Sequence, residues 1–310
     1  NSGLTSIGGQ YNVLVGVNSG RICSGTRNVA IGPDALYAGD PGDYNVIIGD
    51  RAGYNVAGIG KNTFIGGESG FTNTSGNENV NLGYKAGYTN TTGSANVLIG
   101  AGAGYTQGTV SGNTFVGYSA GMVNTGSPNT FVGYLAGRKN TTGVKNTFIG
   151  NQAGYSNTIG SCNTYIGNNA GYSSGTVTSS NTFIGDDSGY NSIGRAHWNT
   201  FVGGMAGRSN TVGKANTFIG NNAGRANTVG GGNTFVGYSA GRTNTSGTNN
   251  TFIGYESGFS NAQGIRHTYI GFQAGLSGLN GTGNVCIGYQ AGNEIGNSSF
   301  NTYVGYQAGF

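Results

Sequence analysis

Side chains that could do acid–base or nucleophilic chemistry are few in this 310-residue sequence, and they are scattered. There are two histidines, His197 and His267. Only His197 lies in a group of mixed functionality, with Arg195 and Trp198 beside it in sequence and Asp186–Asp187 about one repeat earlier. An active site needs a nucleophile, a base and an orienting group that converge, and this cluster lacks such a set. We therefore expect a solvated loop or a partner contact here, and no enzyme activity.

Metal and disulfide chemistry are also weakly supported. Acidic residues total ten, and the Gly-Gly-x-Gly-x-Asp pattern of calcium-binding rolls is absent. The three cysteines, Cys23, Cys162 and Cys286, lie many repeats apart, beyond disulfide reach in a linear stack. The sequence predicts no metal and no other cofactor.

Three arginines recur at a 17-residue step: Arg208, Arg225 and Arg242. Other repeats often carry tyrosine at the same place: Tyr54, Tyr88, Tyr105, Tyr155, Tyr172 and Tyr190. Stacked guanidinium groups repel one another unless anions or partner carboxylates lie between them. The arginine stems could pack over a subunit seam with solvated heads. Alternatively, the row could bind an anionic glycan.

A repeat positions these residues, and its best copy is Asn-Thr-Phe-Ile-Gly-Asn-Asn-Ala-Gly-Arg at 216–225. A short fixed period predicts a solenoid, in which each unit contacts only its neighbours. We expect one continuous domain, 1–310, with a leading turn at 1–11 and eighteen repeats over 12–310. The copies begin at Asn12, Asn28, Asn45, Asn62, Asn79, Asn96, Asn113, Asn129, Asn146, Asn163, Asn181, Asn199, Asn216, Asn233, Asn250, His267, Asn284 and Asn301.

Positions within a copy are counted from the leading Asn as position one, and several of them admit very few residue types. Position two is Thr or Val, position four is Ile, Val or Leu, position five is Gly and position eight is Ala or Ser in all 18 copies. Position nine is Gly in 17 copies, with Leu36 the exception. Alternation with β-branched residues predicts a strand over positions one to five, and Gly permits a turn after it. We expect an all-β protein: a narrow, single-chain β-solenoid (β-roll) of about 18 coils with a 17-residue repeat.

The two strand faces can be assigned in two ways. The strictness of position four favours positions two and four as the interior, so that position three points outward. Position three is aromatic in ten consecutive copies, and an exposed stripe of that length would exceed what a monomer tolerates. We then expect lateral homo-oligomerisation through these rings; the alternative is that the faces are reversed and the rings fill the coil. The ten residues are Phe115, Phe131, Phe148, Tyr165, Phe183, Phe201, Phe218, Phe235, Phe252 and Tyr269.

Position seven and position one predict ladders along the stack. Coils spaced by roughly 4.8 Å would align position-seven charges of alternating sign in one part of the chain and glutamines in another. Asn at position one, present in 17 of 18 copies, predicts a further amide ladder. The position-seven residues are Asp34, Arg51, Glu68 and Lys85, and then Gln273, Gln290 and Gln307.

The repeat resembles the β-roll head repeats of trimeric autotransporter adhesins and related bacterial or phage surface fibres. The matching segments are Asn28-Val29-Ala30-Ile31-Gly32 with Ala35, and Asn96-Val97-Leu98-Ile99-Gly100 with Ala103. The resemblance implies trimerisation and surface exposure. This repeat is longer, usually has Phe where the family has a small third residue, and shows no heptad stalk or membrane-anchor barrel.

The chain ends suggest a junction between copies. The chain stops at position ten of a repeat and starts where position eleven would follow. Joining two chains end to end therefore gives a normal coil with a longer loop. This favours head-to-tail stacking into a filament, although cutting a longer array at two loops would look the same. The junction would involve Asn301, Tyr303 and Phe310 of one copy and Leu4, Ile7 and Tyr11 of the next.

Composition bounds the remaining functions. Charged residues make up 8%, and the net charge of +4 forms no basic run, so nucleic-acid binding is weakly supported. No apolar run is long enough for a transmembrane helix.

We expect a structural, self-assembling fibre subunit, extracellular or at the cell surface, whose partner is itself. The alternative is the head or shaft of a trimeric adhesin or phage-type tail fibre that binds a glycan or host receptor. Ice binding would need the Thr row of position two to face outward, and we expect it inside.

Overall fold

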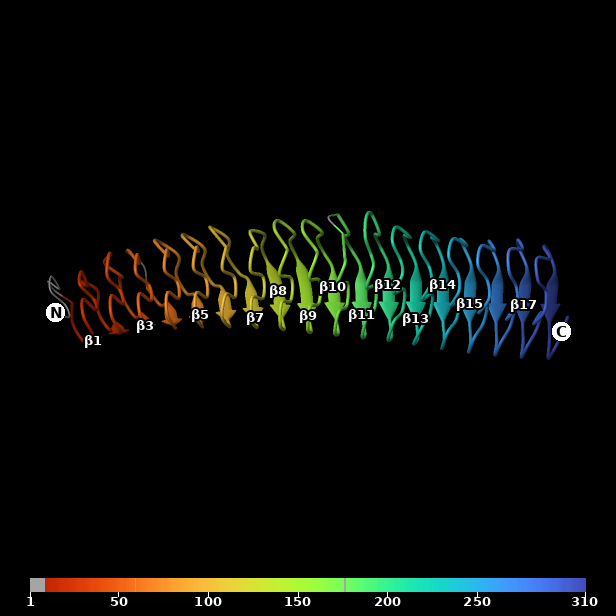
Figure 1. The fold of residues 1–310 in the computed structure, drawn as a ribbon, viewed down its shortest axis with the longest axis horizontal. Coiled ribbons are helices and arrows are strands. Elements are labelled where there is room, and N and C mark those ends of the chain that lie inside the picture. Colours follow the sequence, from red (N-terminus) through yellow and green to blue (C-terminus); the bar gives the residue numbers. More distant parts are fainter. Residues whose placement is uncertain (1–8, 59, 176) are drawn as a thin grey trace. The chain divides into compact units, whose positions relative to one another are not determined.

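The computed structural model describes residues 9–58, 60–175 and 177–310, which are all-β (Figure 1). The chain forms two units, 1–152 and 153–310. Each is a parallel β-solenoid in which every repeat copy contributes one short strand. Within the described ranges no helix has the length and hydropathy to cross a membrane. The predicted fold class is confirmed, and the single continuous domain stays a prediction.

The described residues of the first unit form nine strands, which all begin at position one or two of their repeat. They are β1 (Val13–Val15), β2 (Val29–Ile31), β3 (Val46–Ile48), β4 (Thr63–Ile65), β5 (Val80–Leu82), β6 (Val97–Ile99), β7 (Thr114–Val116), β8 (Asn129–Val132) and β9 (Asn146–Ile149).

Over 153–175 and 177–310, the second unit contains another nine. They are β10 (Thr164–Ile166), β11 (Thr182–Ile184), β12 (Thr200–Val202), β13 (Thr217–Ile219), β14 (Thr234–Val236), β15 (Thr251–Ile253), β16 (Thr268–Ile270), β17 (Val285–Ile287) and β18 (Thr302–Val304).

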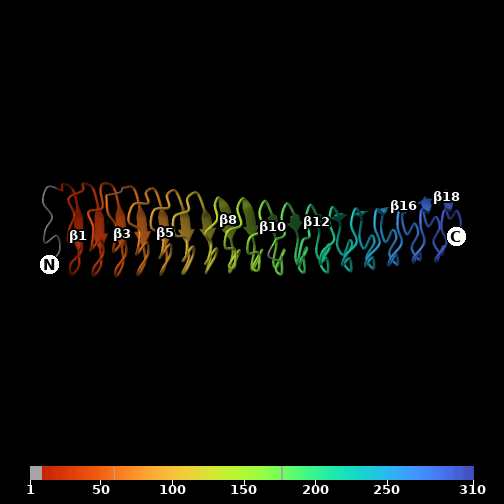
Figure 2. The ribbon, with the colours of Figure 1, turned by 90° about the horizontal axis from the view of Figure 1, so that it is seen from above.

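Within each unit, successive strands pair in parallel and in register, so equivalent repeat positions lie directly above one another. In β12 and β13, for example, Phe201 is opposite Phe218. The rings of these two residues stack with centroids 4.8 Å apart, the strand spacing of a β-sheet. Figures 1 and 2 show this succession of coils from two directions within each unit. The in-register stacking expected from the charge pattern is thus present.

Most strands cover only positions two to four, shorter than the five positions predicted. They end because the glycine at position five has a backbone φ of about +130°, as at Gly220 (φ 134°). That conformation disfavours every residue with a Cβ. The same glycine lies against its counterpart in the next coil, since a Cβ on Gly220 would be 2.3 Å from the carbonyl oxygen of Gly237. Position five is therefore glycine for two reasons, backbone conformation and close axial approach.

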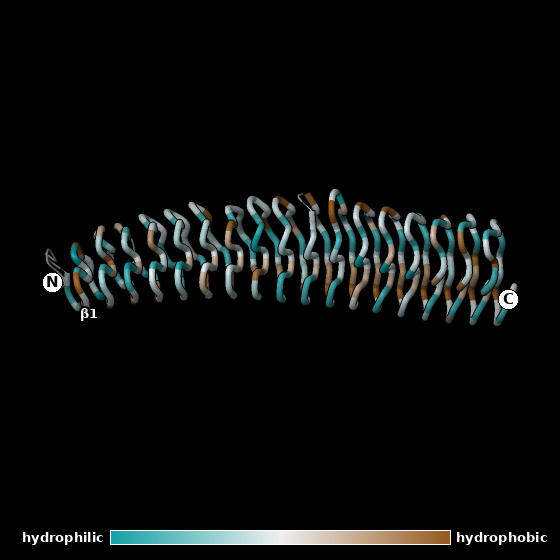
Figure 3. Tube along the Cα trace, in the orientation of Figure 1, coloured by the Kyte–Doolittle hydropathy of each residue, from teal (hydrophilic) through white to brown (hydrophobic). Residues whose placement is uncertain are grey.

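Position three, not position four, fills the coil interior. All ten aromatic residues from Phe115 to Tyr269 have no exposed surface. Between β10 and β16 their rings stack at 4.8–4.9 Å, with planes turned by only 5–8° from one coil to the next. Neighbouring strands usually twist by roughly 20°, so this part of the sheet is nearly flat. Figure 3 shows that hydrophobic stretches are short and recur from coil to coil.

The prediction that these rings face outward as a lateral interface is therefore wrong, and the reversed assignment of the faces holds. The coil closes around the rings because position nine leaves room for them. A Cβ on Gly207, for example, would be 2.4 Å from the Phe201 ring. The buried small residue at position eight, such as Ala206, lets the returning chain pass close by.

The exception at position nine is compensated inside the same coil. Leu36 replaces the glycine, and position three of that repeat is Ala30 in place of an aromatic residue. Both side chains are completely buried. A large residue at nine with a small one at three conserves the interior volume.

Candidate binding surfaces

The leading asparagines form a buried ladder along each unit. The backbone N–H of Asn216 donates to Oδ1 of Asn199 at 3.0 Å, and that of Asn233 donates to Oδ1 of Asn216 at 3.0 Å. The Asn216 amide nitrogen also donates to the carbonyl of Gly230, at 2.8 Å. Each amide thus ties one coil to the next through both its oxygen and its nitrogen.

Position seven carries polar rows along the axis, as its residue types predict. Glu68 is bonded on both sides: Oε1 lies 2.6 Å from Nη2 of Arg51, and Oε2 lies 3.5 Å from Nζ of Lys85. Asp34 stands next to this group and accepts a hydrogen bond from Asn18 at 2.9 Å. The Arg51 and Lys85 side chains are 45% and 30% exposed. Ion pairs whose cations are open to solvent contribute little stability each, so the row favours register more than it stabilises the coil.

The glutamines of position seven form an amide ladder in the second unit. Gln307 donates to Gln290 at 3.0 Å, Gln290 to Gln273 at 2.9 Å, and Gln273 to the carboxylate of Glu256 at 2.9 Å. A uniform donor direction lets each amide both donate and accept along the axis.

Positions two and four form the outward surface of the strands, which we call the strand face. Position two is threonine in ten consecutive copies, and position four is Ile or Val beside each of them. At position four, Ile219 and Ile253 are 39% and 38% exposed, whereas the aromatic residues at position three of the same two copies are fully buried. The expectation that the Thr row lies inside is therefore also wrong. The ten threonines are Thr114, Thr130, Thr147, Thr164, Thr182, Thr200, Thr217, Thr234, Thr251 and Thr268.

A second set of rings, which we call the outer aromatic row, follows the strands at position six. Five consecutive copies carry an aromatic residue there, and their ring centroids stack at 5.1–5.2 Å. Their exposed fractions range from 40% to 73%. Sequence reasoning missed this row because it concentrated on position three, although the recurrence was visible. The residues are Tyr238, Tyr255, Phe272, Tyr289 and Tyr306.

The three arginines at position ten lie together, as their spacing predicts, and we call them the arginine row. Arg208, Arg225 and Arg242 line one open hollow of about 400 Å³. The Nε atom of Arg208 lies 3.1 Å from Oδ2 of Asp187. The row therefore brings three permanent positive charges onto successive coils with one carboxylate in contact.

The two histidines have structural partners. Nδ1 of His197 accepts the backbone N–H of Ser179 at 3.1 Å, and neighbouring Trp198 is 65% exposed. His267 takes the place of an asparagine in the buried ladder: its Nδ1 accepts the N–H of Asn284 at 3.1 Å. Burial lowers the pKa of His267 to about 4, so the ring is neutral at pH 7.

Among the described residues, the cysteines and acidic side chains form no cluster that could hold a metal ion. Cys23 and Cys286 are buried and Cys162 is exposed, all three as free thiols. Burial raises the pKa of Cys286 to about 12, which makes this thiol unreactive at neutral pH. Among the residues that the structure describes, no three His, Cys, Asp or Glu side chains cluster as a metal site would need.

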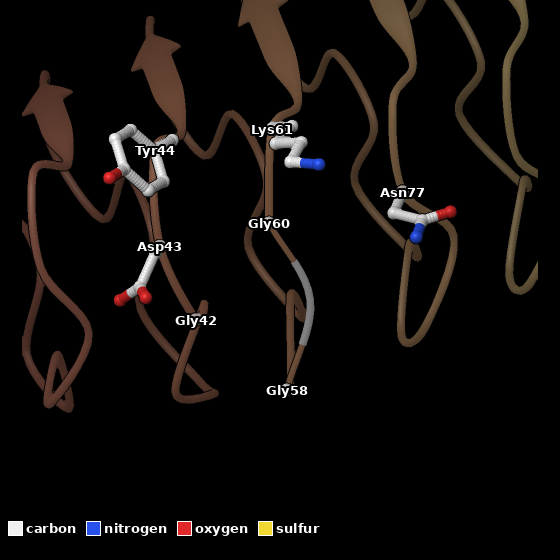
Figure 4. Close-up of a pocket in the computed structure, with 7 residues that line it drawn as sticks. All are labelled: Gly42, Asp43, Tyr44, Gly58, Gly60, Lys61 and Asn77. Atoms are coloured by element: carbon white, nitrogen blue, oxygen red, sulfur yellow. The ribbon is translucent and has the colours of Figure 1, made fainter.

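A hollow of about 360 Å³ in the first unit combines an acid, a base and a ring (Figure 4). Asp43 and Lys61 contribute to its wall, but each is already paired with a group on a neighbouring coil. Asp43 accepts the backbone N–H of Thr26 at 2.7 Å, which lowers the pKa of its carboxyl group. Lys61 lies 3.5 Å from Glu78. These contacts run from coil to coil along the axis of the unit, and we assign no function to the hollow.

The residues expected at an end-to-end junction are only partly described. Leu4 and Ile7 lie outside the described residues. Tyr11 and Phe310 are 77% and 64% exposed. The backbone N–H of Asn301 donates to Oδ1 of Asn284 at 2.9 Å, continuing the ladder.

Comparisons with known proteins give no family for this chain. A scan against protein-family models finds no match, and a search of curated proteins finds none either.

Proposed function

We propose that this chain is a structural, self-assembling subunit of an extracellular fibre, with no enzyme activity. In this proposal chains stack head to tail and also associate sideways. The observation that carries it is the identical axial bonding from coil to coil within each unit. A protein whose coils all add by the same bonds can add a coil of another copy in the same way.

The axial bonds that would join two copies are those already present between coils. Three backbone segments participate: the strand, the turn after position five and the connecting loop. Between the coils of Thr217 and Thr234, for example, Gly237 N–H donates to the Ile219 carbonyl at 2.8 Å, and Gly224 N–H to that of Ala240 at 2.9 Å. The buried Asn ladder adds a side-chain bond at every step. An interface of this kind has high specificity for register.

Sideways association is supported by the strand face and the outer aromatic row. In the second unit Ile253 and Ile287 are 38% and 36% exposed, and Tyr255, Phe272 and Tyr289 are 44%, 40% and 42% exposed. Extended apolar patches rimmed by polar residues mark interaction sites on proteins. The partner in this proposal is the same face of a second copy. The buried rings of position three take no part in it.

Electron microscopy of the purified chain at micromolar concentration tests the proposal. We expect filaments many times longer than one chain, which gather side by side. Replacing Tyr255 and Tyr289 by serine is expected to abolish the bundles and leave single filaments. The control Val229→Ser changes an apolar residue of a connecting loop that is 52% exposed, and it should bundle like wild type. Isolated particles of one chain length at every concentration would contradict the proposal.

The resemblance to trimeric adhesin heads and phage-type fibres supports an alternative, a discrete trimer that binds a receptor. Analytical ultracentrifugation separates the two proposals, because a trimer has a fixed mass at all concentrations whereas a filament grows. The outward Thr row also favours ice binding, since a flat, regular array of hydroxyl and methyl groups can order water. Thermal hysteresis in unassembled protein would support that function in place of sideways association.

A further inference from the structure

The position-ten row of the second unit changes from rings to guanidinium groups and back to a ring. Tyr155, Tyr172 and Tyr190 stack with centroids 5.1 Å apart. The guanidinium carbon of Arg208 lies 5.2 Å from the centre of the Tyr190 ring. At the other end, the guanidinium carbon of Arg242 lies 5.4 Å from the ring of Phe259. The arginine row is therefore bounded by an aromatic ring at each end.

The positive charge of this row is mostly uncompensated. Arg208 has Asp187 at 3.1 Å, but no carboxylate of the described residues lies within 4.0 Å of Arg225 or Arg242. Three like charges on successive coils repel one another, and Arg225 experiences this repulsion from both sides. Arginine cannot relieve it by losing its proton, because its pKa is above 12. An anion placed against the row would remove the repulsion.

The surroundings have the form of a shallow groove rather than a closed pocket. Between the arginines, the hollow of about 400 Å³ is lined by three small residues: Ser209, Ala226 and Thr243. The backbone N–H groups of these residues are already bonded to the next coil. The guanidinium groups are the charged donors of this groove, and a guanidinium group can hold a carboxylate or sulfate in a bidentate manner.

The spacing indicates a polymer rather than a single small ion. The outer arginines lie two coils apart, roughly 10 Å at ~4.8 Å per coil, which is close to the length of a disaccharide. The rings of Tyr190 and Phe259 each lie against a guanidinium group and so close the row at its two ends. We propose that Arg208, Arg225 and Arg242 form a binding site for an acidic polysaccharide whose anionic groups recur once per one or two sugars. The site does not depend on the fibre proposal.

A nucleic acid is a less suitable ligand for this groove. Its phosphates would require a longer basic surface, and the chain has 14 Lys and Arg against 10 Asp and Glu, with no basic run. Single-stranded binders also track the backbone with a continuous positive groove, which is limited here to three coils. Binding of DNA is therefore an outcome of the test that would overturn the proposal.

Fluorescence anisotropy with a labelled chondroitin sulfate hexasaccharide tests the site on the whole chain. We expect binding that weakens as salt rises, and no binding of the desulfated, carboxyl-reduced hexasaccharide. Arg225→Gln should weaken binding about tenfold or more, as expected for lost hydrogen bonds to a charged group. Arg225→Lys should restore part of it, since lysine keeps the charge and loses the bidentate geometry. The triple variant Arg208→Gln, Arg225→Gln and Arg242→Gln should not bind.

A charge-matched control separates a site from general attraction. Arg195→Gln, Lys214→Gln and Arg266→Gln remove three exposed positive charges from connecting loops of the same unit. This triple variant should bind within about twofold of wild type, because exposed charges at a distance are screened by salt. Equal weakening in both triple variants would overturn the proposal. Equally tight binding of single-stranded DNA, or full competition by inorganic sulfate at millimolar concentration, would also overturn it.

Discussion

At the scale of single residues, the ladder at position one shows how one buried polar group can be used at every coil. The asparagine oxygen accepts a backbone N–H from the next coil, so a replacement must offer an acceptor at the same place. His267 does so with Nδ1, which lies 3.1 Å from the backbone nitrogen of Asn284. The ring must then carry its proton on the other nitrogen and remain neutral.

This substitution predicts a local dependence of stability on pH. The pKa of His267 is lowered by burial to about 4, against 6.5 for a free imidazole. The unfolded chain therefore binds more protons between these values, and stability is lost as pH falls from about 6.5 through about 4. His267→Asn restores the ladder amide and should lack this loss. Hydrogen exchange of β15 to β17 between pH 7 and pH 4 measures the difference between the two proteins.

Because both proteins carry the same carboxylates, acid effects elsewhere cancel in that difference. Protection that declines in parallel in wild type and His267→Asn would mean that the imidazole is protonated without cost. The accepting role of Nδ1 would then be wrong.

The assignment of faces shows where sequence reasoning reached its limit. Both surfaces of the strand are rich in apolar residues: Ile or Val at position four, and aromatic residues at three. Alternation thus identifies two faces without saying which is inside. One repeat carries a signal in the sequence, because Leu36 at position nine accompanies Ala30 at position three. Such a volume exchange is expected where both positions share one interior.

At the scale of the coil, close axial packing of backbone decides the conformation. Position five needs glycine because its φ is about +130° and its counterpart in the next coil is in contact. Position seven accepts other residues although its φ is near +55°, as in Arg51 (φ 52°) and Gln273 (φ 53°). The left-handed region costs about 1 kcal/mol or more for residues with a Cβ, so the surrounding coil must impose it.

Two neighbouring glycines give a matched test of this account. A Cβ on Gly66 would be 2.7 Å from the carbonyl carbon of Gly83, at a φ of 130°. A Cβ on Gly67 would have its nearest neighbour, Cδ2 of the Tyr84 ring, at 3.4 Å. We expect Gly66→Ala to destabilise the coil by more than about 3 kcal/mol, since backbone strain of ~1–3 kcal/mol adds to the clash. Gly67→Ala should change stability by less than about 1 kcal/mol.

The measurement is hydrogen-exchange protection of the backbone amides that bond β4 to β5. Hydrogen exchange is suitable because a repeat array can open locally without unfolding completely. Equal protection in both variants would mean that coils do not approach as closely as the distances indicate.

The element order was predictable from the repeat, and the strand bounds were predictable to within one residue at each end. Periodic Thr, Ile and Gly fix where each strand begins and where it stops. The left-handed positions outside glycine were not predictable, because residues as different as Arg51, Leu135 and Gln273 occupy them. Their conformation comes from stacking, which a single repeat does not reveal.

At the scale of the whole molecule, the axial contacts and the outward surface differ in kind. The axial contacts are hydrogen bonds in fixed register. The outward surface consists of Thr, Ile and aromatic side chains, which offer contact area but little directional hydrogen bonding. The spacing of the sequence predicted the arginine row, but its aromatic borders and its uncompensated charge required the structure. The strand face could be identified only from the structure, whereas the recurrence of the outer aromatic row at position six is visible in the sequence.

The assignment of interior and exterior is the central claim, because the outward surface of every coil depends on it. The three natural cysteines allow a test on the unmodified chain. Cys286 occupies position three and is buried, Cys23 is buried, and Cys162 is exposed. Titration with a thiol reagent at pH 7.5 or so, followed by mass mapping of the labelled peptides, counts the accessible thiols. We expect fast labelling of Cys162 alone in the folded chain and labelling of all three cysteines after denaturation. Fast labelling of Cys286 in the folded chain would contradict the assignment and place position three on the outside.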